Sequence, residues 1–127
     1  MKSEKKVKFR EFATSSGKIV LAGKDAESNE QLISQVGKNE DILHTANPGS
    51  PFVNIKGKAN KQDIKEASIF CASKSQDWRD NKKDVKIHVF KGVDTYKIKG
   101  MKTGTFGVKK HKTIVVKKRD VEEFLEN

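Results

Sequence analysis

Apolar and polar residues alternate at every second position in several short stretches of this chain. In residues 85–90, valine and isoleucine alternate with lysine, histidine and phenylalanine. A period of two is typical of a β-strand, because successive side chains point to opposite faces of the sheet. Turn residues such as Ser15-Ser16-Gly17 separate these stretches. We expect strands near residues 6–10, 18–22, 41–45, 52–55, 85–90, 96–99, 105–109 and 113–117, the last two paired with each other.

Residues 25–37 have helical spacing instead. Asp25 is placed as an N-cap, because its carboxylate can accept hydrogen bonds from the free amides of a first helical turn. Leu32, Ile33 and Val36 follow at intervals of about one turn, and Gly37 is the expected C′ residue.

A second helix is expected over residues 61–78, with Asn60 as its N-cap. Asp120 is expected to cap a short C-terminal helix. We predict a single α+β domain over residues 1–127, with residues 1–6 as a flexible basic tail. It has a mixed or mostly antiparallel sheet, two main helices and the short C-terminal helix. The inward face of the second helix is made mainly of small residues, which permit close packing on a sheet: Ile64, Ala67, Ser68, Cys71, Ala72, Ser75 and Trp78.

The composition excludes several classes of protein. No run of about 18 apolar residues is present, so no membrane span is expected. The basic start has no apolar segment behind it, so we expect no secretory signal and a cytoplasmic location. The single cysteine, Cys71, excludes an internal disulfide and is interpreted as a buried small residue rather than a nucleophile. The three histidines are not at metal-ligand spacing and no P-loop occurs, so neither a metal nor a cofactor is expected.

The positive charge is concentrated in one part of the chain. Residues 82–119 contain 13 lysines and arginines against two acids, a net charge of +11, whereas the remainder has a net charge of −1. A one-sided basic field suits a polyanion binder, since each neutralised phosphate releases counterions. The alternative is a solvated lysine face that protects edge strands from aggregation.

Two polar strings follow predicted strands in the first half of the chain. Residues 23–30 read Gly-Lys-Asp-Ala-Glu-Ser-Asn-Glu, and residues 41–51 read Asp-Ile-Leu-His-Thr-Ala-Asn-Pro-Gly-Ser-Pro. Binding groups often collect where strands give way to turns. In a functional reading, Lys24, His44 and Ser50 contact phosphate or ribose. In a structural reading, Asp25 and Asn29 simply fix the corner between strand and helix.

The order and spacing of these strings resemble the NFACT-R (DUF814) domain family. Its pattern is Gly-Arg-Asp-x-x-x-Asn-Glu, then Asp-x-x-His-Ala, then Gly-Ser-His. The likeness extends over about residues 9–118. It implies a module associated with RNA, as in the tRNA-binding factors of ribosome-associated quality control and in free-standing small proteins. The matching positions are Lys24, Asp25, Asn29, Asp41, His44, Gly49, Ser50 and, later, Gly104.

Three positions depart from the family pattern. Lys24 replaces the usual arginine, which keeps the charge but loses the planar two-pronged donor. Leu43 stands where an aromatic residue is common, and Pro51 stands where histidine often follows Gly-Ser. The resemblance implies a non-catalytic module for tRNA or ribosomal RNA, with the ribosome as a partner. It gives no ground for inferring tail-synthesis activity.

The predicted interface combines the strings with the basic third. Aromatic residues are sparse near the lysines, so we expect recognition of phosphates and shape rather than of base sequence. Asp25, Asn29, Asp41 and Gly49 are assigned structural roles. The predicted RNA contacts are Lys24, His44, Ser50, Lys86, Lys97, Lys99, Lys102, Lys109, Lys110, His111 and Lys112.

Two other functions compete with RNA binding. A small RNA-processing or RNA-modifying enzyme would use His44 as a general base, with Asp25 and Asp41 as carboxylates. That hypothesis requires the three side chains to converge in one pocket. A scaffold whose basic face meets an acidic protein is the other alternative, and the oligomeric state is left open.

Overall fold

The structure, a computed structural model, describes residues 8–127, which form a six-stranded sheet with antiparallel neighbours throughout. The expected tail, residues 1–6, lies outside the described residues. The predicted α+β class is confirmed. In sheet order the strands are β1 (Arg10–Ala13), β2 (Ile19–Ala22), β4 (Val53–Ile55), β3 (Asp41–Thr45), β5 (Val85–Lys91) and β8 (Lys112–Val116).

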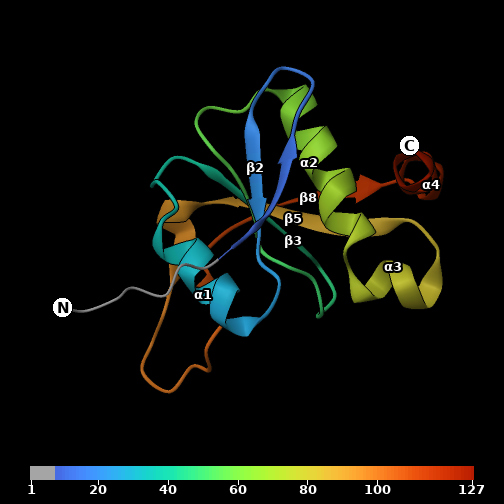
Figure 1. The fold of residues 1–127 in the computed structure, drawn as a ribbon. Helices are drawn as coiled ribbons and strands as arrows, with labels where there is room; N and C mark the ends of the chain where they lie inside the picture. The colour runs from blue at the N-terminus through green and yellow to red at the C-terminus, as the bar shows by residue number, and fades with distance from the viewer. Residues whose placement is uncertain (1–7) are drawn as a thin grey trace.

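Helices lie on both faces of the sheet (Figure 1). The helix of the first polar string packs on one face, and the second and last helices pack on the other. We call these the α1 face and the α2 face. The helices are α1 (Ala26–Ser34), α2 (Lys61–Ser73), α3 (Gln76–Asn81) and α4 (Lys118–Glu126).

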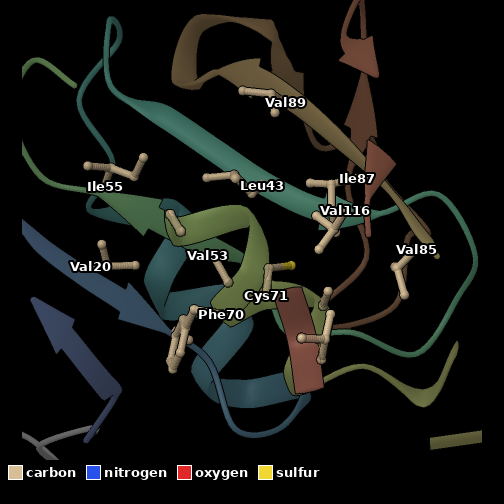
Figure 2. Packing of buried hydrophobic residues seen from close by; sticks show 14 of the residues in the cluster. Val20, Leu43, Val53, Ile55, Phe70, Cys71, Val85, Ile87, Val89 and Val116 are labelled. Carbon is tan, nitrogen blue, oxygen red and sulfur yellow. The ribbon is translucent and has the colours of Figure 1, made fainter. Parts of the chain in front are cut away.

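The larger core lies between the sheet and α2 (Figure 2). Alternate residues of each strand face this layer, and Val20, Leu43 and Ile87 are fully buried in it. Ala67 and Cys71 of α2 are also fully buried, so the predicted small-residue face does allow close packing. Burial of each large aliphatic side chain contributes about 1.5–3 kcal/mol, which makes this layer the main source of stability.

A smaller core lies between the α1 face and α1. It contains Leu32 of α1, Ile42 of β3, Phe90 of β5 and Phe52, which directly precedes β4. All four are buried. Phe106 packs against them from the connection between β5 and β8. This cluster covers only part of the α1 face, because Val115 of β8 is 48% exposed there.

The helix starts were predicted better than the helix ends. Asp25 and Asn60 are N-caps, each in a reciprocal capping box. The predicted helix over residues 61–78 is wrong at its end, because Ser75 caps a new helix by accepting from Trp78 N. The first helix ends at Ser34 with Gln35 as C-cap, before the expected Gly37.

The C-terminal helix also begins earlier than predicted. Its N-cap is Lys117, so the expected cap Asp120 lies in the first turn instead. An acidic residue there still interacts favourably with the positive end of the helix dipole.

The expected strand pairing in the basic third is wrong. Strand β8 pairs with β5, and only two short strands, β6 (Thr95–Tyr96) and β7 (Gly107–Val108), pair with each other in a separate ribbon. Residues 97–106 form a loop, so Lys97 and Lys99 do not lie on a strand. These two lysines therefore do not form part of a lysine-covered sheet face.

Over residues 8–127, no helix combines the length and the apolar character that crossing a bilayer requires.

Candidate nucleic-acid interface

The first polar string forms the corner between β2 and α1. Asp25 caps the helix by accepting from Ser28 N at 2.8 Å. One turn later, Asn29 Oδ1 accepts from Phe52 N at 3.1 Å, which ties the corner to the start of β4. A Cβ atom at position 23 would lie 2.0 Å from Asn29 Oδ1, so only glycine fits there. These two hydrogen bonds fix the corner between strand and helix, as the structural reading of Asp25 and Asn29 expects.

The second polar string forms the turn between β3 and β4. The Ser50 hydroxyl accepts from Thr45 N and donates to Pro51 O, each at 3.0 Å. Gly49 has φ +93°, and a Cβ atom there would lie 2.7 Å from Cβ of Gln76 on α3. Because its proton is held by Pro51 O, Ser50 shapes this turn rather than supplying a donor to a ligand.

The two corners meet at one pocket of about 260 Å³, which we call the basic pocket. It lies where β2 ends and β4 begins. Four of its lining residues are cations and none is a carboxylate, which is a suitable environment for an anion. Its lining consists of Arg10, Gly23, Lys24, Asn29, Gly49, Ser50, Pro51, Lys74 and Arg79.

Hydrogen bonds to backbone carbonyls place two of the cations. Arg10 Nη1 donates to Gly23 O at 3.1 Å, and Arg79 Nη1 donates to Lys74 O at 3.3 Å. Each guanidinium keeps further N–H donors beyond these bonds. Lys24 and Arg79 are exposed, so a large anion can reach the pocket from solvent.

Three histidine rings lie in a row across the α1 face, and we call His44, His88 and His111 the histidine row. His44 of β3 is directly opposite His88 of β5 in the strand register. The rings of His88 and His111 are stacked, with centroids 3.8 Å apart and planes at 24°. At the other end, the His44 ring lies 4.6 Å from the Phe52 ring.

Two histidines of the row have depressed pKa values. Burial lowers the pKa of His44, although hydrogen bonds to the backbone of Thr45 and Ser50 oppose the shift. Burial also lowers the pKa of His88, and the neighbouring rings of His111 and His44 lower it further. Both rings therefore favour the neutral form at neutral pH.

The basic pocket and the histidine row are adjacent. Ser50 lines the pocket, and its hydroxyl accepts a hydrogen bond from the backbone N–H of Thr45, the residue after His44. Asn29 lines the pocket and holds Phe52 N, whose ring contacts His44. The polar strings therefore adjoin the sheet next to His44, a relationship that the sequence did not reveal.

The predicted lysine contacts have different environments. Lys97 Nζ donates to Glu30 Oε1, Lys102 O and Thr105 O at 2.7–2.9 Å, which uses all three of its donors. It also lies 4.5 Å from the centroid of the Phe106 ring. Lys97 is thus a structural tie between α1 and the loop over residues 97–106. The other predicted lysine contacts are exposed and are not held in this way: Lys24, Lys86, Lys99, Lys102, Lys109, Lys110 and Lys112.

The residues of the catalytic alternative do not converge. Asp25 caps α1, whereas buried Asp41 pairs with Lys91 Nζ at 2.9 Å. Asp41 and His44 lie at opposite ends of β3 and, being three residues apart, point to opposite faces of the sheet. The convergence that this hypothesis requires is absent, so the proposed carboxylate–imidazole centre is wrong. Among residues 8–127 no three His, Cys, Asp or Glu side chains are grouped to hold a metal ion.

Sequence reasoning missed Arg10, Lys74, Arg79 and His88 as members of this surface. Lys74 and Arg79 reach the pocket only because the helix breaks at Ser75, and the hydroxyl that caps the new helix was the available signal. Arg10 and His88 are placed by strand register, which depends on pairing between distant segments.

The chain is similar to known proteins in sequence and in fold. The sequence matches the family model described as NFACT protein RNA binding domain over residues 8–110. It is 32% identical over 88 residues to the archaeal Rqc2 homolog aRqcH of Methanocaldococcus jannaschii, a match that covers 66% of this chain and 12% of that protein. The chain therefore spans only a small part of this relative.

The fold is also similar to a solved structure, the C-terminal part of the fibronectin/fibrinogen-binding protein from Streptococcus suis. The TM-score is 0.81 at 20% identity, and the match covers 97% of this chain and 51% of that one. This likeness concerns the fold alone.

Proposed function

Because the chain belongs to the NFACT protein RNA-binding domain family, we propose that its basic pocket and histidine row bind structured RNA, either tRNA or ribosomal RNA. The RNA is recognised through its phosphates and its shape. The domain contributes binding rather than chemistry.

The basic pocket is the observation that carries this proposal. Four cations from β1, the α1 corner, the end of α2 and α3 surround one cavity that has no carboxylate in its lining. Like charges gathered from four separate elements repel one another unless an anion lies between them. RNA phosphates are such anions, and their neutralisation releases counterions.

The similarity to an archaeal Rqc2 homolog suggests the process in which this protein binds RNA. We propose that the protein acts in the cytoplasm on tRNA or ribosomal particles, in ribosome-associated quality control. The ribosome is the proposed partner, since it carries both tRNA and ribosomal RNA.

Salt-dependent binding of tRNA tests the proposal. The wild-type affinity is expected to fall by about 10²-fold between 50 and 200 mM salt if about four phosphates are contacted. The double variant K24E/K74E should bind at least tenfold more weakly at low salt, since it reverses two of the four pocket cations. Fluorescence anisotropy with labelled tRNA measures both quantities.

The matched control is K61E/K65E, which changes the same charge at two exposed positions near the other end of α2. It should bind almost as the wild type does. Equal losses in the two double variants would contradict the placement of the surface. Absence of tRNA binding at low salt, with binding to an acidic protein instead, would support the scaffold alternative.

A further inference from the structure

The histidine row ends in an exposed ring next to the densest group of lysines. His111 is exposed, and its ring lies against that of His88, which is only partly exposed. Lys109, Lys110 and Lys112 adjoin it in the chain and are also exposed. Stacked rings or exposed lysines can each occur for structural reasons alone. Here they lie together and combine an aromatic platform with a positive environment.

We propose that the outer face of the His111 ring, supported by His88, is a stacking site for an unpaired nucleobase of the bound RNA. This inference rests on the proposed function and adds its ligand chemistry. Lys109 and Lys110 contact phosphates next to that base, whereas Lys112 lies opposite Val89 on the α2 face. Single-stranded nucleic acids are commonly held in this way, by stacking on rings beside a basic groove.

The geometry prepares His111 for this role. Its ring is supported from behind at 3.8 Å, so little conformational freedom remains to be lost when a base stacks on it. Its loop is anchored by the bond from Lys109 N to Asp94 O at 2.8 Å and by the first pairs of β8 with β5. Burial and the neighbouring rings lower the pKa of His88, so a neutral support is favoured over a charged one.

The surroundings leave room for a ligand. On this part of the α1 face Thr113 and Val115 of β8 are exposed, because α1 and the loop over residues 97–106 cover only the other part. His44, at the other end of the row, adjoins the basic pocket. The row crosses two strand spacings, about 10 Å, which a short single-stranded segment can span.

The test compares two RNAs and two variants. One RNA is a hairpin with a single-stranded loop, and the other is a blunt duplex of equal length. H111A should lose about tenfold in affinity for the hairpin and bind the duplex as the wild type does. H111F should restore hairpin binding, since a phenyl ring stacks but does not ionise.

Salt titration separates stacking from charge. H111A should keep the wild-type slope of affinity against salt, whereas K110A should reduce that slope by about one. Equal loss on both RNAs, failure of H111F to restore binding, or unchanged hairpin binding by H111A would overturn the stacking site. If the wild type binds neither RNA, the proposed function falls with it; if only the stacking site is wrong, wild-type binding and its salt slope remain.

Discussion

Gly23 and Asn29 show how a single missing side chain shapes the basic pocket. Asn29 Oδ1 reaches Phe52 N across the space that a Cβ atom at position 23 would occupy. Gly23 does not have a positive φ, so the requirement is for space rather than for an unusual backbone conformation. The first glycine of the polar string is therefore explained by contact with the asparagine six residues later.

We expect Gly23→Ala to lower the free energy of unfolding by roughly 1–3 kcal/mol, since Asn29 must move and leave Phe52 N–H without its acceptor. Urea unfolding measures the loss. The control is Asn29→Ala, which removes the same bond without a clash. The double variant should cost little more than N29A, and full additivity would contradict this coupling.

The depressed pKa values of His44 and His88 predict how stability depends on pH. Both rings stay neutral to a lower pH in the folded protein than in the unfolded chain, where they take up protons near the ordinary value of 6.5. The unfolded state thus binds more protons, so the free energy of unfolding falls as the pH drops below about 6.5.

Urea unfolding at pH 7.5 and pH 5.5 measures this effect, and H44Q should reduce the difference between the two values. Glu40 does not interfere, although partial burial opposes its shift, because bonds from Lys56 and from backbone amides lower its pKa to about 2. Its contribution is lost only at pH values below 4.5. Equal stability at pH 7.5 and 5.5 would contradict the role of the histidines.

At the scale of elements, local signals were readable from the sequence and long-range pairings were not. The N-caps Asp25 and Asn60 act within one turn, so residue type and spacing were enough to find them. The pairing of β8 with β5 brings together residues about 25 positions apart and depends on the intervening loop folding onto α1. No local pattern encodes that arrangement.

The candidate site followed the same rule. The two polar strings and the basic third were recognised as separate features, because each lies in one stretch of sequence. Asn29 ties the first string to the chain after the second by accepting from Phe52 N, and the pairing of β3 with β5 brings the basic third beside them. Lys97 was misassigned because an alternating lysine resembles a strand residue until its three acceptors are known.

The loop over residues 97–106 should loosen when its tie to α1 is cut. Glu30 accepts from Lys97 Nζ and from Gly104 N, and the bond from Lys97 is the main cause of its lowered pKa. In E30Q the amide of Gly104 should exchange with deuterium several-fold faster. The same change is expected in the wild type at acid pH, below the ordinary glutamate value of 4.5, as this carboxylate takes up a proton.

E27Q is the matched control, since it neutralises an exposed carboxylate on the same helix. Hydrogen exchange at Gly104 should stay as in the wild type. If both variants exchange alike, the tie does not hold the loop.

At the scale of the molecule, two groups of cations lie at the ends of the histidine row. None of the pocket cations belongs to residues 82–119. They all come from the remainder of the chain, in which positive and negative charges nearly balance. The lysines around His111 belong to the basic part. Net charge by segment therefore underestimated the contribution of residues 1–81, because folding collects four of their cations around a pocket without a carboxylate.

The two groups should contribute separately to RNA binding. We expect K109E/K110E to reduce the slope of affinity against salt by at least two, about one for each lost phosphate contact. K58E/K65E is the control, since both lysines are exposed, whereas Lys56 bonds to Glu40 and would disturb the fold. A similar slope in the two variants would show that the lysines act only through overall charge.

The buried thiol of Cys71 supplies a means of following the whole molecule. It is fully buried, and burial raises its pKa to about 12, although a hydrogen bond with Ser50 opposes the shift. An alkylating reagent reacts with the thiolate, so modification must wait until the chain opens. Since this is the single cysteine of the sequence, the rate of alkylation reports the rate at which the chain opens. Any RNA that binds only the folded form should slow alkylation of Cys71 as its occupancy rises. The affinity can then be measured without attaching a fluorescent group to the protein or to the RNA beforehand.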